Sequence, residues 1–439
     1  MDHPELLDDG PPAARDLALA TWGLFVGLAL LLFAAGLFGT LLGVRSELAG
    51  LPTVASGLIS SSYYLGFLIG SRAALTALSR VGHIRAFSAL ASLLSAAVLG
   101  IGLTASPWSW AGLRLVTGMC MAGQYVVAES WLNDLADNEN RGRILAVYNV
   151  VSIAAFGSGQ VMQFAFDARL MTGFAIASIV ISLAVAPVAL SERAVAPAVG
   201  QRERISLREL ARAVPTGVGS CFLVGVAHGA LLGMAAVFAT RSGLSPGRIG
   251  LFVAAPSVGG VVLQWPISSA SDDIDRRAIG ALAAVGAMVG GALLLVGPAT
   301  SPVAIALIGL VGGLSFPLYA IAGAYTNDWI EPQHVNAAAS QLVTLYGIGA
   351  AIGPITAALL MNAFGTHGYY WALIGLHAAI ASFFVYRMRA WRTPLSKRPI
   401  DEASLPARAF FLPATIVSMA RRGRRNGRVV EKAAETPNR

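Results

Sequence analysis

The sequence predicts an all-α membrane protein with twelve membrane-spanning helices, and three features of the chain lead to this fold class. Of its 439 residues, 56% are hydrophobic and only 12% are charged. A soluble domain usually carries about 25% charged residues, so this chain has too few to cover a surface that faces water. Apolar runs of about 20 residues recur along almost the whole chain, and such runs cross a bilayer as helices. The basic residues stand mostly between these runs, as they do in membrane proteins.

Polar residues, glycine or proline separate the apolar runs into segments. A helix of about 20 residues crosses roughly 30 Å of hydrocarbon at 1.5 Å per residue. The start of the chain, residues 1–18, is acidic and lacks the positive region of a secretory signal, so we expect the first span to remain in the mature protein. The expected spans are 19–43, 53–78, 84–104, 107–133, 143–166, 170–190, 213–240, 247–270, 278–297, 302–328, 336–363 and 367–388.

Positively charged loops predict how the spans are oriented. Cytoplasmic loops of membrane proteins carry an excess of lysine and arginine. With the N-terminus inside, the short inner loops hold Arg80, Arg85, Arg141, Arg143, Arg193, Arg202, Arg204, Arg208, Arg212, Arg276 and Arg277, and the outer loops hold Arg45, Arg169, Arg241 and Arg248. We therefore expect a multi-pass protein of the cell's inner (plasma) membrane with both termini in the cytoplasm. The net charge of +8 reflects this topology, and we expect no nucleic-acid partner.

The chain divides into five expected parts: a cytoplasmic segment 1–18, a six-helix bundle 19–190, a cytoplasmic linker 191–212, a second six-helix bundle 213–388 and a basic tail 389–439. In the linker, Ser206 and Glu209 stand three residues apart as in a capping box, which favours a short surface helix over an unstructured segment. The tail combines a polybasic segment with apolar residues. Such a segment either lies on an anionic leaflet or stays in solution, and the sequence is compatible with both.

The two halves repeat weakly at an offset of 193 or 194 residues. The matching pairs come from four separate helices: Gly50-Leu51 and Gly243-Leu244, Tyr125 and Tyr319, Asn133-Asp134 and Asn327-Asp328, and Gly159 and Gly353. Parallel repeats of six spans, related by an axis along the membrane normal, are typical of transporters. This repeat predicts two pseudo-symmetric six-helix bundles.

Loop and helix motifs resemble those of the major facilitator superfamily (MFS), over roughly residues 19–388. Residues 268–277 keep the acid and the basic pair of its loop motif, residues 80–85 keep a more eroded copy, and residues 114–122 match its arginine-glycine motif in span four. The segment Glu129-Ser130-Trp131-Leu132-Asn133, followed by Arg141-Gly142-Arg143, is similar to a bacterial branch of mostly unassigned function. The resemblance implies the MFS fold and a transporter. The antiporter signature of span five is missing, because Gly157-Ser158-Gly159-Gln160 stands there.

Charged residues in these motifs are the expected gating residues. Ion pairs between helix ends can stabilise one closed face until the two halves move apart. We assign this role to Asp272, Arg276 and Arg277 in the second half and to Arg80, Arg85, Glu129, Arg141 and Arg143 in the first. The alternative is that these loop charges only set the topology.

Spans one, four, seven and ten line the central cavity, as the resemblance implies, and the polar residues on their faces are the expected solute-binding residues. These are Arg114, Tyr125, His228 and Tyr319, together with Gln160, Gln163, Gln341 and Tyr346 on the neighbouring spans five and eleven. An arginine at membrane depth must face protein or water, so Arg114 either binds an anionic or hydroxylated solute or is bonded to helix carbonyls. The glutamines either bind hydroxyls or join helices. His228 either carries a proton or is hydrogen-bonded in the core.

We expect a secondary active or facilitative transporter that moves a small polar organic solute, sugar-like among the candidates, by alternating access. The alternative is a multidrug or lipophilic metabolite exporter whose cavity is lined by Met119, Met121, Met234, Phe238 and Phe316. No catalytic motif or Cys/His cluster is present in the sequence, so we expect neither an enzyme nor a cofactor or metal. No carboxylate falls near the middle of a span, so proton coupling is either absent or carried by His228 or Glu129. We expect a monomer.

Overall fold

The computed structural model describes residues 14–135, 141–191 and 205–390, and all regular secondary structure within these ranges is helical. The first half contains α1 (Ala14–Leu48), α2 (Thr53–Val81), α3 (His83–Leu103), α4 (Pro107–Leu135), α5 (Arg141–Met162), α6 (Thr172–Leu183) and α7 (Val185–Ala189). A short helix, α8 (Leu207–Ala213), precedes the second half. That half contains α9 (Pro215–Gly233), α10 (Ala235–Arg241), α11 (Pro246–Asp273), α12 (Arg276–Leu293), α13 (Pro302–Ser315), α14 (Pro317–Trp329), α15 (Val335–Phe364) and α16 (Gly368–Ala390).

Each expected span corresponds to one helix or to two consecutive helices of the described chain. Three spans are interrupted, between α6 and α7, between α9 and α10, and between α13 and α14. Pro317 stands at the first turn of α14, where its missing N–H is tolerated. By length and composition alone, eight stretches of the described chain are long and apolar enough to cross a membrane, and one of them, Ala337–Ala390, contains most of α15 and all of α16. The helices α2, α4 and α5 fall outside these stretches.

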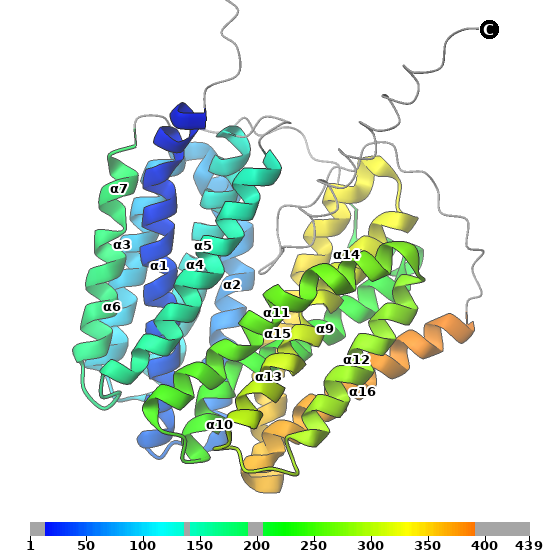
Figure 1. The fold of residues 1–439 in the computed structure, drawn as a ribbon. Coiled ribbons are helices and arrows are strands. Elements are labelled where there is room, and N and C mark those ends of the chain that lie inside the picture. The colour runs from blue at the N-terminus through cyan, green and yellow to red at the C-terminus, as the bar shows by residue number, and fades with distance from the viewer. Residues whose placement is uncertain (1–13, 136–140, 192–204, 391–439) are drawn as a thin grey trace, which may run out of the picture.

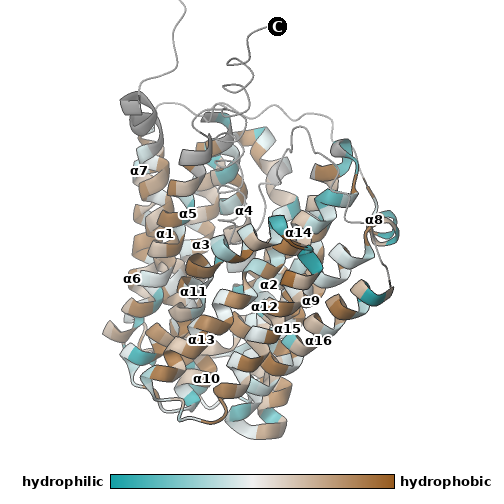
Figure 2. Ribbon diagram, turned by 45° about the vertical axis from the view of Figure 1, so that its right-hand side comes forward, coloured by the Kyte–Doolittle hydropathy of each residue, from teal (hydrophilic) through white to brown (hydrophobic). Residues whose placement is uncertain are grey.

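The helices form two bundles, α1–α7 and α9–α16, which meet at the end where α10 lies and diverge at the other end (Figure 1). Large apolar side chains are exposed on both bundles, with Val150 66% exposed, Leu282 69% and Val303 63%. Hydrophobic residues recur along most of the helices (Figure 2). Such a surface is unfavourable in water and suits lipid. The twelve-span, all-α membrane fold expected from the sequence is therefore confirmed.

Close helix contacts through glycine hold each bundle together, and they repeat from one half to the other. A methyl group on Gly36 of α1 or on Gly159 of α5 would come within 2.1 and 1.9 Å of the partner helix's backbone. Gly229 of α9 and Gly353 of α15 are the residues 193 and 194 positions later, and a methyl group on either would come within 2.2 Å of the other helix. Lipid provides no hydrophobic force between helices, so small residues that allow close packing stabilise their association.

A second set of glycine contacts follows the same repeat. A methyl group on Gly66 of α2 or on Gly118 of α4 would lie only 1.9 Å from a carbonyl oxygen of the other helix. At an offset of 193 or 194, Gly259 of α11 and Gly312 of α13 make the equivalent contacts, at 1.9 and 2.3 Å. Gly50 and Gly243, which end the first span of each half, both adopt a positive φ, 70° and 74°. The weak sequence repeat thus marks equivalent structural positions.

The linker helix α8 begins as the sequence predicts. Ser206 caps it: its side chain accepts a hydrogen bond from the Glu209 N–H at 3.2 Å, and its own N–H donates to the Glu209 carboxylate at 2.9 Å. The hydrogen bonds from the Ser206 backbone and hydroxyl lower the pKa of Glu209. We call the side of the molecule that holds α8 the linker face. The rest of the linker (192–204) and the tail beyond Ala390 lie outside the described residues.

We predict that Gly118→Val lowers the thermal unfolding midpoint of the detergent-purified protein by several degrees. The new side chain meets the Tyr63 carbonyl in a contact that has no room for it, and overpacking costs about 1–3 kcal/mol. Gly112→Val is the control, since Gly112 lies on the same helix and a methyl group there meets nothing within 4 Å. Equal shifts for the two variants would show that the close α2–α4 contact is not the cause.

Candidate functional site

A cavity of about 160 Å³ lies between the two halves and is lined by α1, α2, α4 and α5 of the first and by α9, α10, α11, α14 and α15 of the second. Five of the expected solute-binding residues line it: Arg114, Tyr125, Gln160, Tyr319 and Tyr346. The expected gating residue Glu129 lines it as well. Sequence reasoning did not select α2, yet Ser56, Ser60, Tyr63, Tyr64, Phe67 and Ser71 of that helix form much of the wall. These polar residues explain why α2 is less apolar than most other spans.

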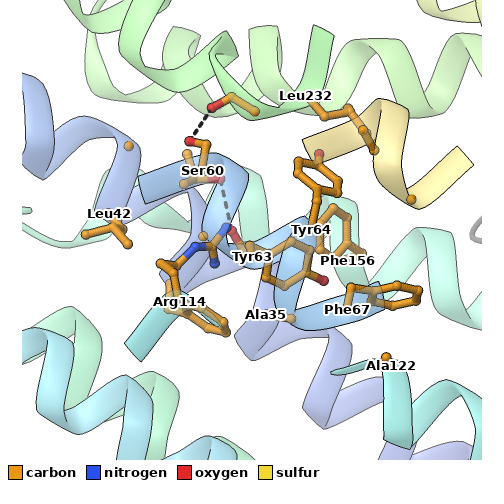
Figure 3. A pocket seen from close by; sticks show the side chains of 18 of the residues that line it. Ala35, Leu42, Ser60, Tyr63, Tyr64, Phe67, Arg114, Ala122, Phe156 and Leu232 are labelled. Carbon is orange, nitrogen blue, oxygen red and sulfur yellow. Dashed lines mark hydrogen bonds between the residues drawn. The ribbon is translucent and has the colours of Figure 1, made fainter. Parts of the chain in front are cut away.

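Arg114 lies in this cavity between two aromatic rings (Figure 3). Its guanidinium carbon is 4.4 Å from the ring centroid of Tyr63 and 5.7 Å from that of Phe38. Rings at these distances attract a cation through their quadrupole. Among the described residues, no carboxylate lies within salt-bridge distance of Arg114. Its N–H groups can therefore bind a group inside the cavity.

Two further polar atoms that line the cavity are buried without a hydrogen-bond partner among the described residues. They are Ser56 Oγ and Gln160 Oε1, and their side chains are 2% and 4% exposed. An unsatisfied buried polar group costs about 1–3 kcal/mol. Ser60, one turn after Ser56, donates instead to the Gly233 carbonyl of the other half at 2.8 Å, at the break between α9 and α10 (Figure 3). Both side chains thus carry an unused hydrogen-bonding atom beside the cavity.

An aromatic group forms the second-half wall of the cavity. The rings of Tyr319 and Tyr346 meet edge to face with centroids 4.9 Å apart. His228 does not line the cavity: it is 2% exposed, packs against Phe316, and its Nδ1 lies 3.0 Å from the Tyr346 hydroxyl. His228 can therefore act on the cavity only by positioning Tyr346.

Two of the expected solute-binding glutamines lie outside the cavity and are engaged elsewhere. The Gln163 amide donates to the Pro246 carbonyl, which joins the end of α5 to the start of α11 across the two halves. The Gln341 amide donates to the Ile205 carbonyl at 2.9 Å, next to the linker helix. In both cases the amide joins chain segments, which is the alternative that the sequence left open.

The two halves are joined by an ion pair that the sequence did not predict. The Arg241 guanidinium donates from Nε and Nη2 to the two carboxylate oxygens of Glu47, both at 2.8 Å, and from Nη1 to the Thr53 hydroxyl at 2.7 Å. The side chains are only 25% and 18% exposed. We call this group, Glu47, Thr53 and Arg241, the clamp, and the side on which it lies the clamp face. Glu47 lies near the end of the first span of the first half, and Arg241 lies near the end of the first span of the second.

The expected gating residues of the second half form ion pairs within that half. Arg276, at the start of α12, contacts Asp328 at 2.6 Å and Asp272 at 3.2 Å. Arg277 pairs with Asp275 at 2.8 Å. Burial opposes ionisation of Asp275, but the hydrogen bonds from Arg277 outweigh it and lower its pKa. These pairs fasten the ends of α11, α12 and α14 to one another.

The first half holds an equivalent pair with a different base. His83, the first residue of α3, lies 3.5 Å from Asp134 at the end of α4, and these are the positions that correspond to Arg276 and Asp328. Arg80 and Arg85 are exposed on the same face. The side chains of Arg141 and Arg143 lie outside those that the structure describes. Within the described ranges, no three His, Cys, Asp or Glu side chains are grouped so that they could hold a metal ion.

Two six-helix halves around a polar central cavity are an architecture found in many secondary transporters. The comparisons with known proteins agree with this class. The family model described as Major Facilitator Superfamily matches residues 217–425, and the one described as Sugar (and other) transporter matches residues 25–191. An uncharacterized MFS-type transporter of Enterobacter sp. (strain 638) is 30% identical over 341 residues, which are 77% of this chain and 88% of that protein. The chain belongs to the major facilitator superfamily, as expected.

Other relatives and solved structures extend this likeness. The uncharacterized MFS-type transporter YcaD of Escherichia fergusonii is 29% identical over 77% of this chain and 88% of its own length. A mutant of the nucleoside transporter NupG superposes with a TM-score of 0.71 at 12% identity, over 84% of this chain and 99% of that one. A bacterial homologue of the human lysosomal transporter Spinster, in an inward-facing and occupied conformation, gives 0.69 at 14% identity, over 87% and 98%. These structures share the fold.

We predict that Glu47→Gln opens the clamp face. Loss of a half-buried ion pair costs of the order of 1 kcal/mol, which changes the ratio of closed to open molecules roughly fivefold. The measurement is the labelling rate, in the purified protein, of a cysteine introduced by Ser46→Cys, because Ser46 lines the cavity beside the clamp and is 2% exposed. The double exchange Glu47→Arg with Arg241→Glu should restore the slow rate. Arg248→Gln is the control, since Arg248 bonds only to the Thr300 carbonyl of its own half.

Proposed function

We propose that this transporter carries a small polar organic solute by alternating access, as a secondary active or facilitative carrier. One observation supports this most directly: polar side chains from both halves face one cavity, and two of their atoms are buried there without partners. A pocket lined by apolar walls with a few convergent polar groups is the usual form of a small-molecule site. The sugar-transporter family model, matched by the first half, supports a polar solute as well. We propose a monomeric carrier with no enzymatic activity.

The bonds between the halves support a form that is closed at the clamp face and open toward the linker face. The clamp, the Ser60–Gly233 bond and the Gln163–Pro246 bond all lie toward the clamp face. Toward the linker face the halves are joined by one long bond at exposed positions, Arg72 to Thr344 at 3.5 Å, among the described residues. With the arginine-rich loops in the cytoplasm, the linker face is cytoplasmic, and this form is open to the inside.

The exporter alternative finds little support in the cavity. None of the five apolar residues expected to line a lipophilic pocket does so: Met119, Met121, Met234, Phe238 and Phe316. Phe238 packs instead against Tyr369, with ring centroids 4.7 Å apart. We therefore favour the polar solute.

Two residues bear on whether the carrier is coupled to protons. Glu129 is the one carboxylate among the described residues that line the cavity, and it lies beside Tyr125 one turn away on α4. A carboxylate in the transport pathway is the usual proton carrier of coupled transporters. If transport is coupled to protons, we propose that Glu129, and not the buried His228, carries the proton. If it is not coupled, we propose that the protein is a facilitator.

We predict that Gly39→Phe abolishes solute binding without unfolding the protein. Gly39 lines the cavity, and a methyl group there meets nothing within 4 Å, so a ring can occupy the solute's space. The measurement is a thermal-shift screen of sugars, organic acids, amino acids and cationic drugs, since a ligand stabilises the state it binds. A polar solute should stabilise the wild type and the control Gly375→Phe, at an open position outside the cavity, but not Gly39→Phe. Hits confined to cationic lipophiles, or hits that survive Gly39→Phe, would contradict the proposal.

We predict opposite labelling of the two faces in intact cells. A membrane-impermeant maleimide should label a cysteine at Ala49→Cys, in the α1–α2 loop of the clamp face, but not one at Arg85→Cys on the linker face until the cells are opened. The native cysteines, Cys120 and Cys221, are buried and give a low background. The reverse pattern would place the termini outside and overturn the proposed orientation.

A further inference from the structure

The charge of Arg114 is not balanced by the protein around it. By contrast, Arg241 forms an ion pair with Glu47, and Arg276 forms ion pairs with Asp272 and Asp328. Arg45 lies between the rings of Trp110 and Phe174 and bonds the Gly102 carbonyl at 3.2 Å. Arg114 has ring neighbours only, and no hydrogen bond of its guanidinium to a described residue is formed. An uncompensated charge at membrane depth is costly, so it points to a partner that arrives from outside.

The fold itself does not require a basic residue at the position of Arg114. In the repeat, α4 corresponds to α13 at an offset of 194, as the contacts of Gly118 and Gly312 show. The residue equivalent to Arg114 is Ile308, which is fully buried in the core of the second half. The same helix packing is therefore built with an isoleucine in one half and an arginine in the other, and the arginine serves the cavity that it lines.

The one acidic residue that lines the described cavity is too far away to neutralise Arg114. Glu129 stands fifteen residues further along α4, which is about 22 Å at 1.5 Å per residue. At that distance, and at an effective dielectric constant of about 20, the two charges attract each other by only about the thermal energy. Arg114 thus defines a positive end of the cavity toward the clamp face, and Glu129 lies toward the linker face.

Polar atoms without partners lie at the same end of the cavity. Ser56 is near the start of α2, Arg114 is in the second turn of α4, and Gln160 is near the end of α5, and all three helix ends lie toward the clamp face. Ser56 Oγ can donate or accept a hydrogen bond, and Gln160 Oε1 accepts one. A solute bound here meets a planar cation and at least one acceptor for its own O–H groups.

Resting on the proposed carrier function, we propose that the solute is an organic acid that carries hydroxyl groups. Its carboxylate pairs with the Arg114 guanidinium, which matches a carboxylate through two parallel N–H donors. Its hydroxyl groups bond Ser56 Oγ and Gln160 Oε1. The rings of Tyr63 and Phe38 attract the guanidinium and help to hold it in place.

The test compares acids with neutral molecules of similar shape on the full-length purified protein. The probe pairs are gluconate with sorbitol, galacturonate with galactose, and lactate with propane-1,2-diol, and the measurements are the thermal-shift midpoint and the Kd from equilibrium dialysis. At least one acid should bind to the wild type, and Arg114→Gln should raise its Kd by roughly tenfold or more, the effect of losing a charged hydrogen bond. Arg114→Lys should retain part of the affinity, because it keeps the charge but not the two-pronged geometry.

Arg45→Gln is the matched control, because Arg45 is also flanked by two rings but lies outside the cavity. It should leave the Kd of the acid unchanged. The unliganded midpoint provides a second readout: Arg114→Gln should not lower it, since removing an unbalanced buried charge does not cost stability. A large drop would show that Arg114 is a structural residue and would overturn the inference.

The remaining outcomes separate this inference from the proposed function. If only the neutral partners bind, and Arg114→Gln leaves their Kd unchanged, the proposal of a polar-solute carrier is retained and the proposal of an anionic solute is wrong. If no probe of either kind binds, and none of the sugars or amino acids of the wider screen does, both proposals fail.

Discussion

Helices in a bilayer must approach closely before dispersion forces can hold them, since the surrounding lipid is as apolar as the side chains. In this protein glycine provides that approach at many positions, of which Gly36, Gly159, Gly229 and Gly353 pair the first span of each half with the fifth. Where two backbones are this close, neither helix can slide past the other without a clash. Each half is therefore packed as one unit, and the cavity lies between two such units.

The same repeat shows where the two halves differ. Glu47 pairs with Arg241, but the repeat places Thr240 at the position equivalent to Glu47 and Leu48 at the position equivalent to Arg241, so this ion pair has no second copy. His83 and Arg276 are equivalent bases that hold Asp134 and Asp328 on the opposite face. Arg114 has only Ile308 as its equivalent. The helix packing is symmetric, whereas the charges that line the cavity and close one face are not.

The distribution of charge also explains why the two faces differ. On the linker face, Arg276 bonds Asp272 and Asp328 of its own half. On the clamp face, Arg241 reaches Glu47 and Thr53 of the other half through three hydrogen bonds. A charged pair that is mostly shielded from water is stronger than one that is exposed. The position of these interfacial bonds therefore supports the proposed form that is closed at the clamp face.

The sequence by itself determined the all-helical membrane fold, the twelve spans, the duplicated halves and the family. Hydrophobic length and loop charge are local properties, and a chain with few charged residues has no other stable arrangement in lipid. It also singled out Arg114, Gln160 and the paired tyrosines Tyr125 and Tyr319, because helical spacing places residues of one span on one face.

Only the tertiary structure decided which of the selected residues share a cavity. Gln163, His228 and Gln341 are as polar as those that line it, but their side chains are bonded to Pro246, Tyr346 and Ile205. The clamp joins residues 194 positions apart, and the wall formed by α2 depends on how that helix is rotated against α4 and α15. Helical periodicity fixes the relative angles of residues on one helix but not the direction in which the helix faces, and that direction is set by the glycine contacts with its neighbours.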